Sequence, residues 1–454
     1  MGIRVYNTMK KKVENFIPVE EGKVKIYGCG MTVQESPHLG HLRNFVVTDV
    51  MIRHFEIRGY KVQYVTNFTD VDDKIIEKAK EKKVDYRIVA QRYIDEFKEV
   101  EKELNIKQAF AYPRATQYIT EIKELIISLE KKGFAYESDG DVYFDVTRFK
   151  PYGKLSGKKI ADLIEGFRVD TEKKRNPFDF ALWKKAKEGE PYWYSPWGKG
   201  RPGWHIECSA MSMNLLGSPF DIHRGGTDLI FPHHENEIAQ AEGASNKEFV
   251  RYWVHSEMVN LKGAKMSKSE RRFKTVKDLL QRFSPDALRF YLLQAHYRSQ
   301  IDYNEERLKE AERAIERIYN FIIEGENKNI KDVEVDITDF LEVMDDDFNT
   351  PKAISIMFDN IKRGWEKIKR GERWEDEHNK VKKMAEILGF RIIKREIEKV
   401  ENSRDNMIKE ILEFREDLRK EKLYKYADKI RDILSAHYII EDTLCGVKVK
   451  KRWR

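Results

Sequence analysis

Cysteine and proline are scarce in this sequence, and no long apolar run occurs in it. Only 3 of the 454 residues are cysteine and 12 are proline. Three cysteines cannot all pair and are too few to cross-link so long a chain, which excludes a disulfide-stabilised fold and favours a reducing compartment. The longest stretch without an acidic or basic side chain, Cys208 to Phe220, is too short to cross a bilayer. The first residues lack a signal-peptide apolar region, so we expect a cytoplasmic protein that does not enter a membrane.

The composition is that of a folded protein with a modest basic charge. Hydrophobic residues make up 41% of the chain and aromatic residues 12%, which excludes general disorder. The length allows about three domains. The formal net charge is +7, and the segment from Lys399 to the end holds 15 basic and 11 acidic side chains. This basic end is compatible with a solvated tail and with a contact to a polyanion.

The first quarter of the chain predicts a parallel strand, helix and strand unit. Residues 24–29 and 61–66 are rich in β-branched and aromatic side chains, as is typical of strands. Between them, apolar residues recur with the spacing of an amphipathic helix: Leu42, Phe45, Val46 and Val50. Such units bind ligands in the loop that leaves the carboxyl end of the first strand, so we expect a site directly after Cys29.

Further along, the pattern predicts an inserted domain and then helices. Residues 119–131 predict a helix and 141–145 a strand, whereas 220–223 predict a strand of the parallel sheet, with a turn at 224–226 and a helix from His233. Apolar residues spaced as on one helix face follow Ile301, and Thr350-Pro351 predicts an N-cap and a first-turn proline.

We therefore predict an α/β fold: a Rossmann-type parallel-sheet catalytic domain with an inserted connective domain, followed by an all-α bundle and a small C-terminal domain. The expected domains are a nucleotide-binding catalytic domain at 1–115 and 198–250, the insertion at 116–197, a linking region at 251–305, a helical bundle at 306–396 and a C-terminal region at 397–454.

Two short motifs carry side chains suited to a nucleoside triphosphate. His38-Leu39-Gly40-His41 lies at the predicted start of the first helix, where exposed N–H groups stabilise phosphate and the glycine lets a base or ribose approach the backbone. Lys265-Met266-Ser267-Lys268-Ser269 predicts a loop whose two lysines neutralise leaving pyrophosphate. Taken alone, each motif is also typical of an ordinary surface segment.

Together, in this order and context, the two motifs resemble the signatures of class I aminoacyl-tRNA synthetases. Within that class the chain is similar to the cysteinyl-tRNA synthetase family, and the resemblance runs nearly end to end, less specifically over the last fifty residues. It is carried by Tyr27-Gly-Cys-Gly-Met-Thr-Val33, Thr66-Asn-Phe-Thr-Asp-Val-Asp-Asp73, Gly203-Trp-His-Ile-Glu-Cys-Ser209, Phe231-Pro-His-His-Glu-Asn-Glu237 and Met344-Asp-Asp-Asp-Phe-Asn-Thr-Pro351.

Four side chains in these motifs form a candidate zinc site. Cys29 ends a predicted strand, Cys208 follows the insertion, and His233 and Glu237 stand four residues apart on one helix face, which gives sulfur, sulfur, nitrogen and oxygen ligands suited to zinc. On residue chemistry alone the fourth ligand stays open between Glu237, His234 and Glu235, since all three lie close together in the sequence. The residue four after His234 is Ile238, so this is not the two-histidine motif of zinc peptidases.

The resemblance implies a ligase that activates L-cysteine with ATP and Mg2+ and transfers it to tRNA(Cys), with one Zn2+ that selects the thiolate. It also implies that the region 251–305 contacts the tRNA stem, that 397–454 binds the anticodon and that the enzyme is a monomer. The implied catalytic residues are His38, His41, Lys265 and Lys268, the ATP contacts are His38, Gly40, His41, Asp228 and Lys268, and the amino-acid pocket holds Thr69, Trp204 and Asp228.

Some of these assignments stay open on residue chemistry alone. Trp204 is equally suited to a core position, Thr69 to a plain turn, and Asp228 to either the substrate amine or the ribose. Two other functions also remain: a ligase that gives cysteine to a small amine, and an RNA-binding protein that has kept the fold without the chemistry. The basic C-terminal segment favours a tRNA substrate over a small amine, and the intact motifs favour an enzyme.

Overall fold

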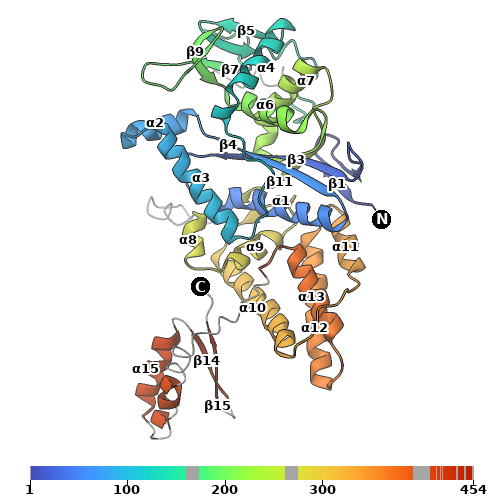
Figure 1. Ribbon diagram of the computed structural model, residues 1–454, viewed down its shortest axis with the longest axis vertical. Helices are drawn as coiled ribbons and strands as arrows, with labels where there is room; N and C mark the ends of the chain where they lie inside the picture. The colour runs from blue at the N-terminus through green and yellow to red at the C-terminus, as the bar shows by residue number, and fades with distance from the viewer. Residues whose placement is uncertain are drawn as a thin grey trace.

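The computed structural model describes most of the chain and combines a parallel sheet, an inserted antiparallel sheet and a helical half (Figure 1). The described residues are 2–159, 173–260, 275–391, 410–415, 417–419, 421, 423–435, 438–443 and 446–451. Within these ranges no helix is both long and apolar enough to cross a bilayer.

The centre of the fold is a four-stranded parallel sheet in the order β11, β10, β3, β4. Its strands are β3 (Lys23–Thr32), β4 (Lys61–Thr69), β10 (Phe220–Gly226) and β11 (Val250–Ser256). All four point the same way, so their carboxyl ends meet at one edge of the sheet, which is where such folds bind ligands. A short hairpin, β1 (Arg4–Asn7) with β2 (Lys12–Asn15), precedes them.

Helix α1 (Leu39–Ile57) connects β3 to β4 and completes the predicted unit. It differs from the predicted amphipathic helix, because it is buried on nearly every side, with the polar side chains of Arg43, Asp49 and His54 inside as well. The physical reason is that α1 packs against the sheet on one side and against helices of the C-terminal half on the other. After β4 the chain forms α2 (Asp73–Lys82), α3 (Tyr86–Glu103) and the short turn η1 (Ala115–Gln117).

The insertion folds around a five-stranded antiparallel sheet with the order β5, β6, β7, β9, β8. Its elements are α4 (Ile119–Lys131), β5 (Ala135–Ser138), β6 (Asp141–Phe144), β7 (Phe180–Lys185), β8 (Trp193–Ser195) and β9 (Gly198–Pro202). Helix α4 matches the helix predicted at 119–131. The sheet, however, continues through β9, past the boundary placed at residue 197, because the glycines of β9 carry little strand signal of their own.

The chain then returns to the parallel sheet. Helix α6 (Trp204–Leu216) leads to β10, the turns η2 (Thr227–Leu229) and η3 (Ile230–His234), α7 (Glu235–Ser245) and β11. The turn predicted at 224–226 is wrong: these residues extend β10 and pair with β11, and the chain turns only at η2. Strand β11 also shows that the parallel sheet continues past the boundary placed at residue 250.

The C-terminal half is mostly helical. It contains β12 (Val259–Asn260), α8 (Val276–Leu280), α9 (Pro285–Leu293), β13 (Ile301–Asp302), α10 (Glu305–Asn327), α11 (Thr338–Asp345), α12 (Thr350–Arg370) and α13 (Glu375–Ile387). The apolar face of α10 is buried as its spacing predicts. Asn349, not Thr350, caps α12, since its side chain accepts the Lys352 N–H. Farther on lie α15 (Tyr424–Ser435) and an antiparallel hairpin, β14 (Tyr438–Thr443) with β15 (Gly446–Lys451).

Candidate metal and nucleotide site

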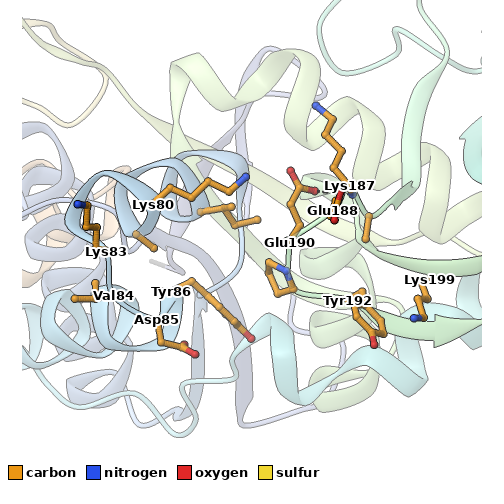
Figure 2. A pocket seen from close by; sticks show the side chains of 15 residues that line it. Lys80, Lys83, Val84, Asp85, Tyr86, Lys187, Glu188, Glu190, Tyr192 and Lys199 are labelled. Carbon is orange, nitrogen blue, oxygen red and sulfur yellow. Dashed lines mark hydrogen bonds between the residues drawn. The ribbon is translucent and has the colours of Figure 1, made fainter.

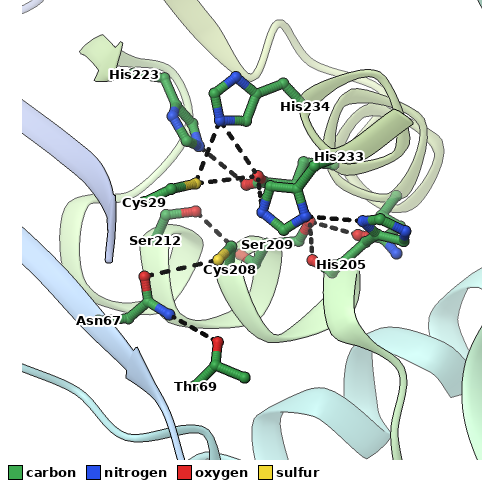
Figure 3. A network of polar contacts seen from close by, with 12 residues as sticks. Cys29, Asn67, Thr69, His205, Cys208, Ser209, Ser212, His223, His233 and His234 are labelled. Carbon is green, nitrogen blue, oxygen red and sulfur yellow. Dashed lines mark hydrogen bonds and ion pairs between the residues drawn. The ribbon is translucent and has the colours of Figure 1, made fainter. Parts of the chain in front are cut away.

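The four predicted metal ligands lie together in the interior. Cys29, Cys208 and His233 are labelled in Figure 3. One donor atom from each of Cys29, Cys208, His233 and Glu237 lies within 4.8 Å of every other, and all four residues are buried. They come from β3, from α6 and from the junction of η3 with α7. Two sulfurs, one imidazole nitrogen and one carboxylate oxygen at this spacing form a donor set that suits zinc.

Two further histidines, His205 and His223, form hydrogen bonds with two of these ligands. Nδ1 of His205 lies 2.8 Å from Nδ1 of His233, so a hydrogen bond there leaves Nε2 of His233 turned toward Glu237 Oε1 at 3.0 Å. Nε2 of His223 lies 2.9 Å from the other carboxylate oxygen of Glu237. Partners of this kind fix the orientation of metal ligands. The sequence patterns did not identify His205 or His223, because each lies on a different element from the ligand it orients.

The structure also bears on the two residues that were alternatives to Glu237. The Glu235 carboxylate accepts N–H groups from Gly153 at 2.9 Å and from Ser156 at 2.8 Å, so it binds the backbone of the insertion and belongs to neither donor set. His234 is nearer, with Nε2 at 3.2 Å from Cys29 Sγ. A second donor set, Cys29, His223, His234 and Glu237, therefore overlaps the first but contains only one sulfur.

Burial and close packing shift the acidities in this cluster. A hydrogen bond with Cys29 lowers the pKa of the Cys208 thiol to about 6, whereas burial raises the pKa of Cys29 well above its ordinary value. Burial alone would raise the pKa of Glu237, but the charges of His223 and His233 outweigh it and lower the pKa to about 2. A carboxylate that is ionised and a thiol that ionises readily are the states in which these groups bind a metal.

The residues of the first signature motif cap helix α1. The His41 N–H donates to Nδ1 of His38 at 3.3 Å, and the His38 N–H donates to Nδ1 of His41 at 3.4 Å. The two rings stack with their centroids 3.6 Å apart. A Cβ on residue 40 would lie 3.1 Å from the His38 ring, so the glycine lets this ring occupy its position without a steric clash. Burial lowers the pKa of His38, and burial together with the His38 ring lowers the pKa of His41 to about 3.

The three predicted residues of the amino-acid pocket, Thr69, Trp204 and Asp228, differ in how far they are buried. Thr69 is buried at the end of β4, and its hydroxyl lies 3.4 Å from the side-chain nitrogen of Asn67, whose oxygen lies 3.7 Å from Cys208 Sγ. The ring of Trp204 lies 4.5 Å from that of His233 and is 40% exposed, so this tryptophan is not a core residue. Asp228 is exposed in η2, and its charge acts on His38.

The second signature motif, with Lys265 and Lys268, lies outside the described residues. The chain that follows it is described and returns to the first motif, because the Val276 N–H donates to the Pro37 carbonyl at 2.9 Å and Thr275 forms a bridge with His38. Residues 275 and 276, which follow the second motif in the sequence, therefore lie beside the first motif at the start of α1.

Comparisons with known proteins agree with this architecture. Residues 15–313 match the model of the class I (C) tRNA synthetase catalytic domain, and residues 339–392 match the DALR domain. The methionyl-tRNA synthetase of Mycobacterium tuberculosis, solved with methionyl-adenylate, has a similar fold, with a TM-score of 0.58 and 15% identity over 81% of this chain and 89% of that one. The fold and the matched catalytic domain define a class I aminoacyl-tRNA synthetase, which is a ligase.

Curated relatives identify the family within this class. The cysteine–tRNA ligases of Thermococcus onnurineus and Thermotoga maritima are each 44% identical to this chain. The first alignment covers 99% of both chains, and the second covers 98% of this chain and 99% of its relative. The chain belongs to the cysteine–tRNA ligase family.

Proposed function

We propose that this protein uses ATP to activate L-cysteine and then transfers the amino acid to tRNA(Cys). In the first step a carboxylate oxygen of cysteine attacks the α-phosphorus of ATP, which gives cysteinyl-adenylate and releases pyrophosphate. In the second step a hydroxyl of the terminal ribose of tRNA attacks the carbonyl carbon, and AMP leaves. The observation that carries the proposal is the cluster of four metal donors, which lies within the matched class I (C) catalytic domain at residues 15–313.

The donor set fits a zinc ion held by Cys29, Cys208, His233 and Glu237. The two sulfurs favour zinc over a hard cation. The atoms of His233 and Glu237 that do not face the metal site, Nδ1 and Oε2, form hydrogen bonds with His205 and His223. When bound, zinc supplies a soft Lewis acid that prefers the thiolate of cysteine to the hydroxyl of serine. Shape alone discriminates poorly between these two amino acids, whose side chains differ by one atom.

His38 and His41 position the triphosphate as neutral hydrogen-bond donors. Their Nδ1 atoms both accept backbone N–H groups, so the ring proton of each lies on Nε2, on the far side of the ring. The lowered pKa values keep both rings neutral near pH 7. Two Nε2–H groups at a helix N-terminus favour phosphate oxygens, while Lys265 and Lys268 neutralise the pyrophosphate that leaves and Mg2+ accompanies ATP.

The remaining pocket residues orient the substrates. Thr69 and Trp204 form the walls next to Cys208 and His233, and Gly40 gives the nucleotide room at the start of α1. The charge of Asp228 acts on His38, and this carboxylate binds either the ammonium group of cysteine or the ribose of ATP. No protein nucleophile is required, so the rate depends on positioning and on charge stabilisation.

The proposal also assigns tRNA contacts to the C-terminal half. Region 251–305 contacts the tRNA stem, and the basic region 397–454 binds the anticodon. What supports this is the matched DALR domain at 339–392 and the excess of basic side chains beyond Lys399.

The proposal is tested by supplying labelled cysteine, ATP and total tRNA with and without a zinc chelator. We expect label on acid-precipitable tRNA, cysteine-dependent pyrophosphate exchange, and loss of both activities after chelation. Exchange without charging would show instead a ligase that transfers cysteine to a small amine. Zinc-loaded protein without either activity would contradict the proposal.

A further inference from the structure

The sequence motif at 344–351 has no task in the proposed reaction, although two of its aspartates are buried. Asp345, the last residue of α11, binds His54 at 2.8 Å and Arg58 at 2.9 Å near the end of α1. Asp347 lies two residues later, in the loop before α12, and is 2% exposed. Its partners are different and lead toward the start of α1 instead.

The backbone at Asp347 is held in an unusual conformation. The φ angle is +59° at Asp347 and +54° at Phe348, which places both in the left-handed region. Aspartate adopts this region more readily than a bulky residue such as phenylalanine. The Phe348 ring is buried, with its centroid 5.6 Å from that of Phe55 and 5.9 Å from that of His54. Contacts with the rest of the fold therefore hold this loop in place.

The Asp347 carboxylate accepts three hydrogen bonds in the interior. They come from the Tyr297 hydroxyl at 2.5 Å, from Nε of Arg298 at 2.7 Å and from the Tyr6 N–H at 2.8 Å. The backbone carbonyl of Asp347 lies 3.0 Å from Nε2 of His296, which donates to it because a carbonyl can only accept. Asp347 therefore binds three consecutive residues of the segment that follows α9.

The backbone carbonyls of this segment, residues 296–299, bind the nucleotide side of the fold. Two of them accept hydrogen bonds from Nη2 of Arg43, which lies two residues after His41 on α1. A third, that of Tyr297, accepts the Glu257 N–H at 2.8 Å. The segment therefore connects the loop before α12 to the start of α1.

A second connection runs through the Tyr297 ring. This ring lies 5.6 Å from the guanidinium of Arg224, which is fully buried in β10 and donates to the Ser256 hydroxyl at 2.9 Å. Burial lowers the pKa of Arg224 to about 10, and nearby negative groups, among them Asp347, act against this. Four residues after Arg224 the chain reaches Asp228. The position of Tyr297 therefore affects the strand that leads to Asp228 as well as α1.

We propose that Asp347 is a positioning residue for the ATP half of the reaction. By binding residues 296–299, it holds Arg43 and Glu257, and with them the start of α1, in the arrangement that binds ATP. This inference rests on the proposed function, which assigns the histidines at the start of α1 to the triphosphate. The metal donors lie on β3, α6 and the junction of η3 with α7, so zinc and cysteine binding should depend much less on Asp347.

The test is Asp347→Asn, because asparagine keeps the size of the side chain and tolerates positive φ but is a weaker acceptor. We expect the KM for ATP in cysteine-dependent pyrophosphate exchange to rise about tenfold. The KM for cysteine and the zinc content should stay within about twofold of wild type. A KM for cysteine that rises as much as the KM for ATP would overturn the inference.

Asp345→Asn is the matched control within the same motif. Asp345 is also a buried carboxylate, but it binds the far end of α1. We expect this variant to be less stable than wild type, with its KM for ATP within about twofold. Equal increases of the KM for ATP in Asp345→Asn and Asp347→Asn would show a general loss of packing and would contradict a positioning role.

A second control tests whether the loss of any negative charge has the same effect. Asp85 is exposed at the N-cap of α3, in a groove of about 680 Å³ between α2, α3 and the insertion (Figure 2). Asparagine is an equally good N-cap residue, so Asp85→Asn should fold normally and keep its KM for ATP. If its KM for ATP rises as much as that of Asp347→Asn, net charge alone explains the effect and the inference is wrong.

Two further variants separate the carboxylate from the turn. Asp347→Gly relieves the backbone and removes the carboxylate, so we expect its KM for ATP to rise at least tenfold, whereas an aspartate that served only the turn would be replaced by glycine without effect. Tyr297→Phe removes one donor to Asp347 and should raise the KM for ATP about threefold. This milder variant decides the matter if Asp347→Asn does not fold: an unchanged KM for ATP in folded Tyr297→Phe would overturn the inference.

A double variant tests whether Asp347 acts through Arg43. If it does, Asp347→Asn combined with Arg43→Gln should raise the KM for ATP about as much as Arg43→Gln alone, about tenfold. Independent effects would multiply to about 100-fold, and that result would contradict the path through residues 296–299.

Direct binding of ATP, measured by calorimetry, separates this inference from the proposed function. Wild-type protein without cysteine-dependent exchange contradicts the proposed function. ATP binding that is weaker in Asp347→Asn than in Asp345→Asn supports the inference whether or not exchange occurs. Equal binding by these two variants, or wild-type protein that binds no ATP, overturns it.

Discussion

At the scale of single residues, neighbouring carboxylates have different tasks because each points to a different partner. Glu237 and Glu235 are both fully buried at the start of α7, but Glu237 faces His223, His233 and Cys29, while Glu235 binds backbone N–H groups of the insertion. Their positions in the sequence do not distinguish them, whereas their hydrogen bonds do. This pair therefore provides a matched test of the metal site.

Glu237→Gln should lose bound zinc, because an amide is a much weaker ligand than an ionised carboxylate. We expect zinc content, measured by atomic absorption after purification, to fall well below one per chain, with cysteine-dependent exchange reduced about 100-fold. Glu235→Gln should keep its zinc and lose about 1 to 3 kcal/mol of unfolding free energy from weakened hydrogen bonds to the insertion. The reverse pattern of zinc loss would show that Glu235 is the ligand.

His41→Asn should change how stability depends on pH. The pKa of His41 is about 3 in the folded protein and 6.5 in its ordinary state. Between these two pKa values the unfolded chain binds a proton at His41 that the folded chain does not bind. The free energy of unfolding therefore falls as the pH drops from about 6.5 toward 3. The contribution of this residue to that fall is up to about 1.4 kcal/mol per pH unit. Urea unfolding of His41→Asn at several pH values should show a slope shallower by about that amount. Equal slopes would mean that the His41 imidazole is protonated in the folded protein.

The sequence predicts the site residues better than it predicts their environment. Cys29, Cys208, His233 and Glu237 were predicted from motif resemblance and ligand chemistry, and the structure brings them together. His205 and His223 were not predicted, because a residue that orients a ligand needs only to be near it in space, and both come from separate elements. The same holds for Asn67, which links Thr69 to Cys208.

At the scale of secondary-structure elements, helix α1 connects the nucleotide motif to the rest of the fold. Arg43, two residues after His41, is 1% exposed and donates to the carbonyls of Glu257 at 2.9 Å, Met258 at 3.2 Å and His296 at 3.0 Å. The Glu257 carboxylate in turn lies 3.3 Å from the Thr227 hydroxyl, next to Asp228. Arg43 thus fixes the loop around Asp228 relative to the start of α1.

Arg43→Gln should impair ATP use more than cysteine use. Loss of the guanidinium leaves buried carbonyls without donors, and we expect the KM for ATP in the exchange assay to rise about tenfold, with the KM for cysteine and the zinc content nearly unchanged. Arg53→Gln is the matched control on the same helix: Arg53 pairs with Asp49 at 2.9 Å, far along the helix from His38. Equal effects of the two changes on the KM for ATP would indicate a purely structural role for Arg43.

Elements whose burial depends on distant segments were the least predictable. The strand and helix at 61–66 and 119–131 were predicted from local pattern and are confirmed by β4 and α4. Helix α1 showed an apolar stripe, but its polar face is also buried, because charged partners such as Arg289 with Asp49 neutralise it in the interior. The turn predicted at 224–226 failed because its two glycines, which usually mark a turn, here pair with His255 and Ser256 of β11.

At the scale of the whole molecule, the reaction centre and the proposed anticodon region are separate parts of the chain. The metal donors and the first signature motif lie between residues 29 and 237, and Figure 1 shows α15, β14 and β15 set apart from the elements that carry them. Those last elements pack on one another, and the hairpin register is set by pairing of Tyr438 with Lys451. Cysteine activation should therefore be independent of the C-terminal region.

Removing residues 397–454 should separate the two half-reactions. We expect the shortened protein to keep its zinc and to exchange pyrophosphate within about twofold of the full chain, while kcat/KM for charging falls about tenfold or more through a higher KM for tRNA. Because the lost contacts involve basic side chains and phosphates, the fall should be largest at low salt and small at high salt. Charging that is unaffected at every salt concentration would contradict anticodon binding by this region, whereas loss of exchange in a folded, zinc-loaded protein would show that the region supports the catalytic domain.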